Sequence, residues 1–173
     1  DVDGVLTDGR LLYGTGGEPL LAFDIKDGLA LKLARLAGLE VGILSGRSSA
    51  ALTQRAEALG ISAVVAGRED KGVAYREWLT RCGARTEEIA YVGDDLLDLP
   101  ILLHCGLALA PADAAPEVRA VVHRVLDAAP ALVEGPDGHA ARHERGEEPG
   151  DGLVVDLGLE GAASVDGFNA REV

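Results

Sequence analysis

The chain has 173 residues, 47% of them hydrophobic, which is enough to form one well-cored domain. Its 16 basic and 29 acidic residues give a formal net charge of −13 at pH 7, and this charge disfavours nucleic acids and anionic membrane surfaces as partners. No apolar run reaches the roughly 18 residues of a membrane-spanning helix, so a cytoplasmic protein is expected.

The chain opens with D-V-D-G-V-L-T-D-G, which places two carboxylates two positions apart. Residues i and i+2 of an extended segment point to the same side, so Asp1 and Asp3 can converge on one substrate atom. Gly4 then allows the backbone to turn sharply away. A buried strand that delivers such a pair needs several apolar residues before Asp1, so we expect this first strand to be truncated in the sequence.

A β-hairpin is predicted next, with strands over residues 11–13 and 19–23 around a glycine-rich turn. Beyond it, short apolar strands alternate with amphipathic helices, a pattern typical of a doubly wound, Rossmann-like parallel sheet. The expected helices cover residues 27–37, 49–59, 71–82, 96–104 and 114–121, and the expected strands cover residues 40–44, 63–66, 89–92 and 107–109.

The composition changes to Gly, Pro, His and charged residues over 134–152, a mixture that cannot bury enough surface to become ordered. We therefore expect one domain over residues 1–130 and a flexible tail over 131–173, in which residues 153–157 could add an edge strand. Cys82 and Cys105 lie in apolar or helical surroundings without CxxC spacing. This favours two buried free thiols in a cytosolic protein.

Four polar clusters follow one another along the chain, each near the end of an expected strand, where parallel α/β sheets carry their sites. They suit phosphoryl transfer through an aspartyl-phosphate, because a carboxylate is a competent nucleophile toward phosphorus and its acyl phosphate hydrolyses in a second step. We expect Asp1 to be this nucleophile. The clusters are Asp1 with Asp3, Ser45 in I-L-S-G-R, Lys71 in E-D-K-G-V-A, and Asp94, Asp95 and Asp98 in V-G-D-D-L-L-D-L-P.

Each of these residue types has a role in such a reaction. A Mg²⁺ ion would cancel the repulsion between Asp1 and an anionic substrate, and Asp1 with Asp94 would supply its oxygen ligands. Ser45 can donate a hydrogen bond to the transferring phosphoryl group, and Lys71 can place a positive charge beside it. Asp3 is placed to protonate the leaving alcohol and then to activate water.

Two other classes of acidic site, the EF-hand loop and the receiver domain, can be compared with the order of residues in this chain. An EF-hand loop needs an oxygen ligand at its fifth position and glycine at its sixth, whereas this chain has Val5 and an early Gly4. A receiver domain of two-component signalling places its acidic pair before the phosphorylated aspartate, whereas Asp94 and Asp95 come last here. Both alternatives are disfavoured.

The four motifs in this order resemble the haloacid dehalogenase superfamily of phosphatases. Within it, the chain is similar to the capless branch that contains the 3-deoxy-D-manno-octulosonate 8-phosphate phosphatases. Four stretches carry this second resemblance: the hairpin, F-D-I-K-D-G at 23–28, S-G-R-S-S at 45–49 and Y-V-G-D-D-L-L-D-L-P at 91–100. The resemblance covers roughly residues 1–126 and implies the same fold, a sheet with a hairpin flap and no cap.

The resemblance also implies specific roles. Asp1 is then the nucleophile, Asp3 the acid/base, and the Mg²⁺ ligands are Asp1, the backbone carbonyl of Asp3, and Asp94. It implies a homotetramer in which the hairpins pack together and a neighbouring subunit helps to close each site. The candidates for binding a small phosphorylated sugar acid are Lys26, Gly46, Arg47 and Arg68. The guanidinium fork of an arginine is well suited to binding the carboxylate of such a substrate.

The expected activity is Mg²⁺-dependent hydrolysis of a sugar-acid phosphate, with the octulosonate 8-phosphate of lipopolysaccharide synthesis as the first choice of substrate. Two alternatives stay open. One is a nonulosonate 9-phosphate phosphatase of sialic-acid-type pathways. The other is a phosphatase-like oligomerisation module associated with a cytidylyltransferase, although such a module has no need of the complete motif set.

Overall fold

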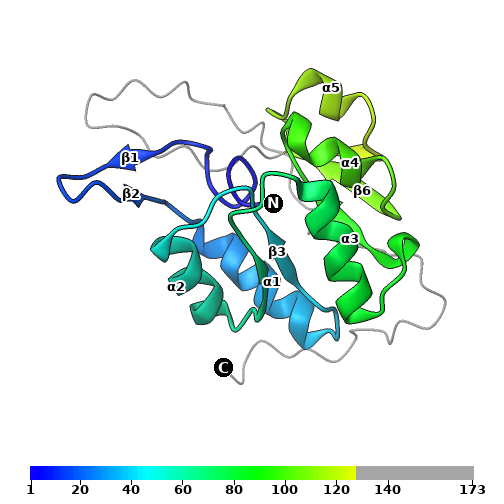
Figure 1. Ribbon diagram of the computed structural model, residues 1–173, viewed down its shortest axis with the longest axis horizontal. Coiled ribbons are helices and arrows are strands. Elements are labelled where there is room, and N and C mark those ends of the chain that lie inside the picture. Colours follow the sequence, from blue (N-terminus) through cyan, green and yellow to red (C-terminus); the bar gives the residue numbers. More distant parts are fainter. Residues whose placement is uncertain (128–173) are drawn as a thin grey trace, which may run out of the picture. The chain divides into compact units, whose positions relative to one another are not determined.

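Short parallel strands alternate with helices in the computed structural model, which describes residues 1–127 (Figure 1). These residues contain two groups of parallel strands. In the first, β3 (Gly42–Leu44) pairs with β4 (Ala63–Val65); in the second, β6 (Leu107–Ala110) pairs with β5 (Ala90–Val92) and with β7 (Arg124–Val125). The predicted α/β class with parallel strands is confirmed. The short, exposed strand β7 was not predicted from the sequence.

The helices begin and end at the residues that cap them. Asp24, Ser49 and Asp70 each accept a backbone hydrogen bond at the start of a helix. Gly60 and Gly83 end two of the helices in the left-handed conformation, with φ of 69° and 71°. The helices are α1 (Ile25–Leu36), α2 (Ala50–Leu59), α3 (Lys71–Cys82), α4 (Leu99–Leu102) and α5 (Pro116–Arg119).

Two predicted helices are shorter than expected. The segment 96–104 forms a 3₁₀ turn, Leu96–Asp98, and then the four-residue α4. Pro100 lies in the first turn of α4 and has no N–H to bond back, which separates the two pieces. The helix predicted over 114–121 spans only α5, because the chain returns to the sheet where the His123 N–H donates to the Ala108 carbonyl.

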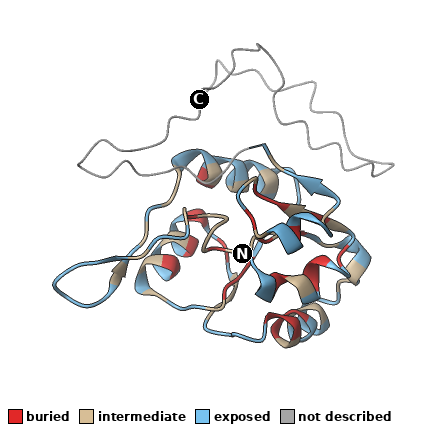
Figure 2. Ribbon diagram, turned by 90° about the horizontal axis from the view of Figure 1, so that it is seen from above, coloured by how far each residue is buried: buried red, intermediate tan, exposed pale blue. Residues whose placement is uncertain are grey.

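The hairpin between Asp8 and Asp24 extends away from the rest of the described residues (Figure 1). Its strands, β1 (Leu12–Tyr13) and β2 (Pro19–Leu20), are antiparallel and shorter than predicted. Most of its residues are exposed, as Figure 2 shows. A further 3₁₀ turn, Thr86–Glu88, precedes β5.

Two clusters of buried apolar residues hold the described residues together (Figure 2). One lies around β5, β6 and α4 and includes Ile101 and Ala108. The other lies around β3 and α2 and includes Val2 and Ile43. Since Val2 is only 1% exposed, the residues on either side of it are held beside β3.

The two cysteines differ in their surroundings. Cys105 is a buried free thiol, as predicted, but Cys82 is exposed, so its predicted burial is wrong. Cys82 is the last residue of α3, and residues 80–82 at this end of the helix are all exposed. No helix within residues 1–127 is both long and apolar enough to cross a membrane. The predicted tail over 131–173, with its edge strand over 153–157, lies outside the described residues.

Candidate active site

Asp1 lies between the two groups of strands. Its backbone nitrogen donates to the Val92 carbonyl at the end of β5 over 2.9 Å, while Val2 packs in the cluster around β3. Three successive N–H groups, of Val5, Leu6 and Thr7, then donate to the single carbonyl of Val2. This tight turn holds the Asp1–Asp3 segment in place.

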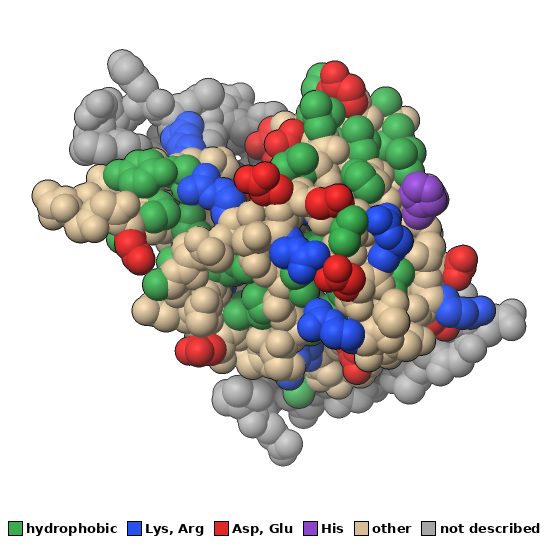
Figure 3. All heavy atoms as spheres, viewed as in Figure 1, with side chains coloured by type: hydrophobic (Ala, Val, Ile, Leu, Met, Phe, Trp, Pro, Cys, Tyr) green, Lys and Arg blue, Asp and Glu red, His purple; other side chains and the backbone are tan. Residues whose placement is uncertain are grey.

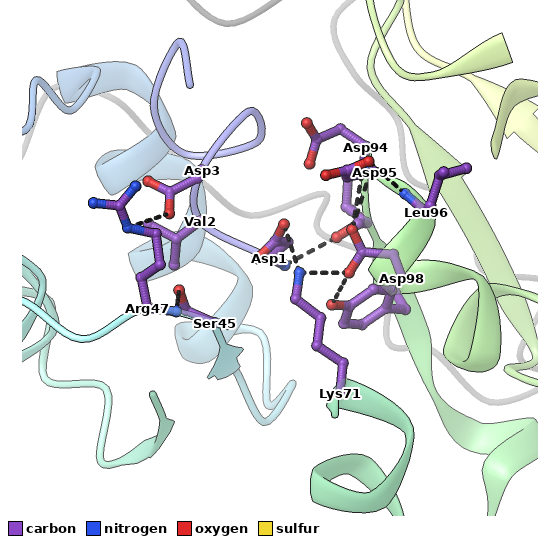
Figure 4. Close-up of polar contacts among 12 residues, drawn as sticks. Asp1, Val2, Asp3, Ser45, Arg47, Lys71, Asp94, Asp95, Leu96 and Asp98 are labelled. Atoms are coloured by element: carbon purple, nitrogen blue, oxygen red, sulfur yellow. Dashed lines mark hydrogen bonds and ion pairs between the residues drawn. The ribbon is translucent and has the colours of Figure 1, made fainter. Parts of the chain in front are cut away.

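Lys71 joins two buried carboxylates from distant parts of the chain. Its Nζ lies 2.8 Å from Asp1 Oδ2 and 2.8 Å from Asp98 Oδ1 (Figure 4). The three side chains are at most 5% exposed. Lys71 is the first residue of α3, and the Asp70 cap fixes the start of that helix. The arrangement orients the Asp1 carboxylate, as expected for a nucleophile held ready for attack.

Asp98 is the most completely satisfied group in the site. Its Oδ1 accepts hydrogen bonds from Lys71 and from the Tyr91 hydroxyl, the latter over 2.6 Å. Its Oδ2 accepts from the backbone N–H groups of Asp94 and Asp95. These four donors stabilise a carboxylate that has no exposed surface. Asp98 therefore positions Lys71 and the Asp94 loop.

Asp94 has a different environment. Within residues 1–127, its Oδ1 atom is buried and has no hydrogen-bond partner. Burial, reinforced by the nearby negative charge of Asp98, raises the pKa of Asp94 to about 6. Carboxylate oxygens of Asp1, Asp94 and Asp98 lie within 4.8 Å of one another. A buried, unpartnered carboxylate oxygen beside a second carboxylate is a donor set that suits a hard divalent cation.

This cluster fits the predicted Mg²⁺ site in part. The oxygens of Asp98 are already occupied by four donors, so Asp1 and Asp94 are the carboxylates with oxygens left for a cation. The Asp3 carboxylate is outside the cluster. Its predicted contribution, through the backbone carbonyl, stays a prediction.

Asp3 and Ser45 lie on the side of Asp1 away from Lys71 (Figure 4). Ser45 follows β3 and is 2% exposed, and its Oγ accepts a hydrogen bond from the Arg47 backbone N–H over 3.2 Å. The Arg47 Nε lies 4.0 Å from Asp3 Oδ2. A small hollow opens beside them, lined by Val2, Asp3, Leu11, Pro19, Leu21, Ser45, Arg47, Ser48, Ser49 and Leu52.

The haloacid dehalogenase-like hydrolase family matches residues 20–106 of the chain. The chain belongs to this family. It is 41% identical over 125 residues to the 3-deoxy-D-manno-octulosonate 8-phosphate phosphatase KdsC of Yersinia pestis, a match that covers 72% of the chain and 67% of the relative. The phosphatase of the same name from Haemophilus influenzae is 42% identical over 126 residues, which are 73% of the chain and 70% of the relative.

A solved structure shares the fold of this haloacid dehalogenase-like hydrolase. It is the 3-deoxy-D-manno-octulosonate 8-phosphate phosphatase of Moraxella catarrhalis, in complex with magnesium ion, phosphate ion and KDO. The match has a TM-score of 0.72 and 34% identity, and it covers 75% of this chain and 74% of that one. The resemblance inferred from the four motifs is thus confirmed.

The structure brings some of the predicted site residues of this hydrolase together and leaves others apart. Asp1, Lys71 and Asp94 lie on one side of the site, and Asp3, Ser45 and Arg47 on the other. Sequence reasoning missed Tyr91 and gave Asp98 no role. The signal for Asp98 was its position three residues after Asp95, the spacing of a capping box.

The other substrate-binding candidates do not line the hollow within this single chain. Lys26 is exposed near the start of α1. The Arg68 guanidinium pairs with Glu77 Oε2 at 3.0 Å and lines a separate groove beside β4. The backbone at Gly46 faces the carbonyl of Arg68. The substrate-binding roles of Lys26, Gly46, Arg47 and Arg68 stay predictions.

Proposed function

We propose that the protein is a Mg²⁺-dependent phosphatase that hydrolyses 3-deoxy-D-manno-octulosonate 8-phosphate through an aspartyl-phosphate. The buried Asp1–Lys71–Asp98 array beside the unpartnered oxygen of Asp94 carries this proposal. The activity named for the Yersinia and Haemophilus relatives, and the ligands of the Moraxella structure, support the substrate and the cation. Lipopolysaccharide synthesis is the process that such an activity would serve.

The first half-reaction transfers the phosphoryl group to Asp1. An Asp1 carboxylate oxygen bonds to phosphorus while the bond between phosphorus and the sugar oxygen breaks, and Asp3 gives its proton to that oxygen. The oxygen of Ser45 already accepts from the Arg47 N–H, so its own hydroxyl hydrogen is free to bond the phosphoryl group. Bound by Asp1 and Asp94, Mg²⁺ would neutralise charge on the phosphoryl oxygens.

The second half-reaction releases phosphate. Asp3, now ionised, takes a proton from a water molecule, whose oxygen attacks the phosphorus of the acyl phosphate and frees the Asp1 carboxylate. The Asp3 side chain is 29% exposed and borders the hollow, a position from which it can reach both the leaving alcohol and water. The Lys71 ammonium holds Asp1 in place through both steps.

Phosphate release from the purified protein tests the proposal. We expect hydrolysis of octulosonate 8-phosphate that requires Mg²⁺ and stops when a chelator is added. Asp1→Asn should reduce kcat by at least ~10³-fold, as expected for loss of a nucleophile. Asp8→Asn is the matched control, because the Asp8 carboxylate lies in the neighbouring loop and accepts the Arg10 backbone N–H there. Unchanged activity in Asp1→Asn would overturn the mechanism, and higher kcat/KM for a nonulosonate 9-phosphate would change the substrate.

We also propose that the active form is a homotetramer assembled through the hairpins. Leu12, Tyr13 and Leu20 are 54%, 66% and 63% exposed, and Figure 3 shows hydrophobic side chains gathered on the hairpin. A two-stranded hairpin is marginally stable alone in water, so packing against other copies would stabilise it. We place the enzyme in the cytoplasm, a proposal that the free thiols of Cys82 and Cys105 support.

A further inference from the structure

The hollow beside Asp3 has two walls that come from different parts of the chain. Leu11, Pro19 and Leu21, from the legs of the hairpin, form one wall. Ser48, Ser49 and Leu52, from the start of α2, form the other. The hollow holds only about 10 Å³, so the leaving group of a substrate whose phosphoryl group lies between Asp1 and Ser45 extends past it, along the hairpin legs. The position of the hairpin legs then decides how a large leaving group is held.

Arg55 connects the two walls. It belongs to α2, and its Nη2 donates to the backbone carbonyl of Asp24 over 2.7 Å. Its guanidinium carbon lies 5.6 Å from the centre of the Phe23 ring, within the range of a cation–π contact. Phe23 follows Leu21 by two residues and packs against the apolar cluster around β3 and α2. The exit of the hairpin is thus held directly on α2.

Gly28 leaves space for this connection. It is buried within α1, where glycine costs about 1 kcal/mol relative to alanine. A Cβ atom at Gly28 would overlap Nη2 of Arg55. Three residues of the F-D-I-K-D-G stretch, Phe23, Asp24 and Gly28, therefore meet at one guanidinium.

We infer that Arg55 is a positioning residue that fixes the hairpin legs beside the leaving group and so selects for the sugar acid. This inference rests on the proposed function. Arg55 touches neither Asp1 nor the groups around it, so it acts through the hairpin legs and leaves the phosphoryl site unchanged. Its removal should weaken reactions with large leaving groups selectively.

Two substrates of different size test this inference with Arg55→Gln in the full chain. For octulosonate 8-phosphate, KM should rise about tenfold because the leaving group is misplaced. For acetyl phosphate, whose two-carbon leaving group is too small to extend past the hollow, kcat/KM should stay within about twofold of wild type. Equal losses on both substrates, or no change on either, would overturn the role of Arg55.

Arg35→Gln is the matched control. The Arg35 Nη1 donates to the Leu59 carbonyl over 2.8 Å, so it also joins α1 and α2 through a backbone oxygen, but at the far end of the helix pair. We expect both substrates to be processed as in wild type. A selective loss on the sugar acid in Arg35→Gln as well would show that any loosening of the two helices has this effect, against a specific role for Arg55.

Gly28→Ala keeps Arg55 in the chain but changes the position of its guanidinium. The added methyl group displaces the end of the Arg55 side chain and lies 3.2 Å from a methyl group of Leu59, while alanine favours the helix, so the thermal midpoint should change only slightly. We expect the same selective rise in KM as in Arg55→Gln; wild-type kinetics would contradict the inference. Wild-type protein that hydrolyses acetyl phosphate but not octulosonate 8-phosphate would instead overturn the proposed substrate, and this inference with it.

Discussion

The Tyr91 hydroxyl donates a 2.6 Å hydrogen bond to Asp98 Oδ1, the same oxygen that accepts from Lys71. Burial, together with the adjacent negative charge of Asp98, raises the pKa of Tyr91, so the hydroxyl stays protonated and remains a donor. Tyr91 and Lys71 thus bond the same oxygen of Asp98, and Lys71 also pairs with Asp1. A tyrosine on β5 is thereby linked to the proposed nucleophile.

Tyr91→Phe should lower kcat about tenfold and change KM little, an effect typical of groups that orient a catalytic residue. Without the hydroxyl, Asp98 attracts Lys71 more strongly and weakens its contact with Asp1. Steady-state kinetics with octulosonate 8-phosphate measure kcat and KM separately. Tyr75→Phe is the matched control, because Tyr75 is also a buried residue but its hydroxyl faces Thr86 at 3.4 Å, outside the site. Equal losses in both variants would contradict a specific role for Tyr91.

Asp98→Asn should reduce both activity and stability. The amide has one oxygen where the carboxylate has two, so either Lys71 with Tyr91 or the backbone N–H groups of Asp94 and Asp95 lose their acceptor. We expect a loss of about 3 kcal/mol in the free energy of unfolding, since a buried ion pair is broken. Chemical denaturation measures this loss. Asp113→Asn, at an exposed position, should leave the denaturation midpoint unchanged.

Much of the fold could be predicted because local signals mark its elements clearly. The bounds of α3 were predicted correctly, since Asp70 caps its start and Gly83 ends it. The strand β7 was missed because two exposed residues carry no apolar pattern. The helix predicted over 96–104 was too long, because the capping of Leu96–Asp98 and the position of Pro100 divide it.

Those site residues that directly follow a strand could be predicted from the sequence. The carboxyl ends of parallel strands share an edge, so Ser45 and Asp94 had to come near Asp1. Tyr91 and Arg55 could not be found in this way. The first lies within a strand and the second within a helix, and their partners, Asp98 and Asp24, are defined only by tertiary packing.

The proposed tetramer predicts that a charge on the hairpin disrupts assembly. Leu20→Lys should convert tetramers into smaller species, because the ammonium would be buried among apolar side chains of other copies. Light scattering during size-exclusion chromatography measures the mass. Leu103→Lys is the matched control, since Leu103 is 59% exposed but follows α4. A tetramer that survives Leu20→Lys, or wild-type protein that is monomeric, would contradict the proposed assembly.

The two cysteines should react very differently with a thiol reagent. Burial raises the pKa of the Cys105 thiol, so at pH 8 less of the reactive thiolate is present, and the reagent cannot reach it. Cys82 is exposed. We expect Ellman's reagent to modify one thiol per native chain and the second only in denaturant. In Cys82→Ser, the native chain should show no rapid reaction; rapid modification of that variant would show that Cys105 is accessible.

Gly4→Ala should weaken the binding of Mg²⁺ at the proposed cation site. Gly4 has a φ of +84°, which costs an alanine about 1–2 kcal/mol, and an added Cβ would overlap the Asp94 carboxylate. The displaced carboxylate should raise the Mg²⁺ concentration for half-maximal activity about tenfold. Activity measured across a Mg²⁺ titration tests this expectation.

Gly83→Ala separates the two effects of Gly4→Ala, which are backbone strain and overlap with the Asp94 carboxylate. Gly83 has a similar φ of +71°, but among residues 1–127 no atom outside its chain neighbours and its own helix backbone lies within 4 Å of the position of an added Cβ. It should therefore lose a similar amount of stability with an unchanged Mg²⁺ requirement. If the two variants show the same Mg²⁺ dependence, backbone strain rather than contact with Asp94 explains the effect of Gly4→Ala. If only Gly4→Ala needs more Mg²⁺, Gly4 is required because its missing side chain leaves space for the Asp94 carboxylate.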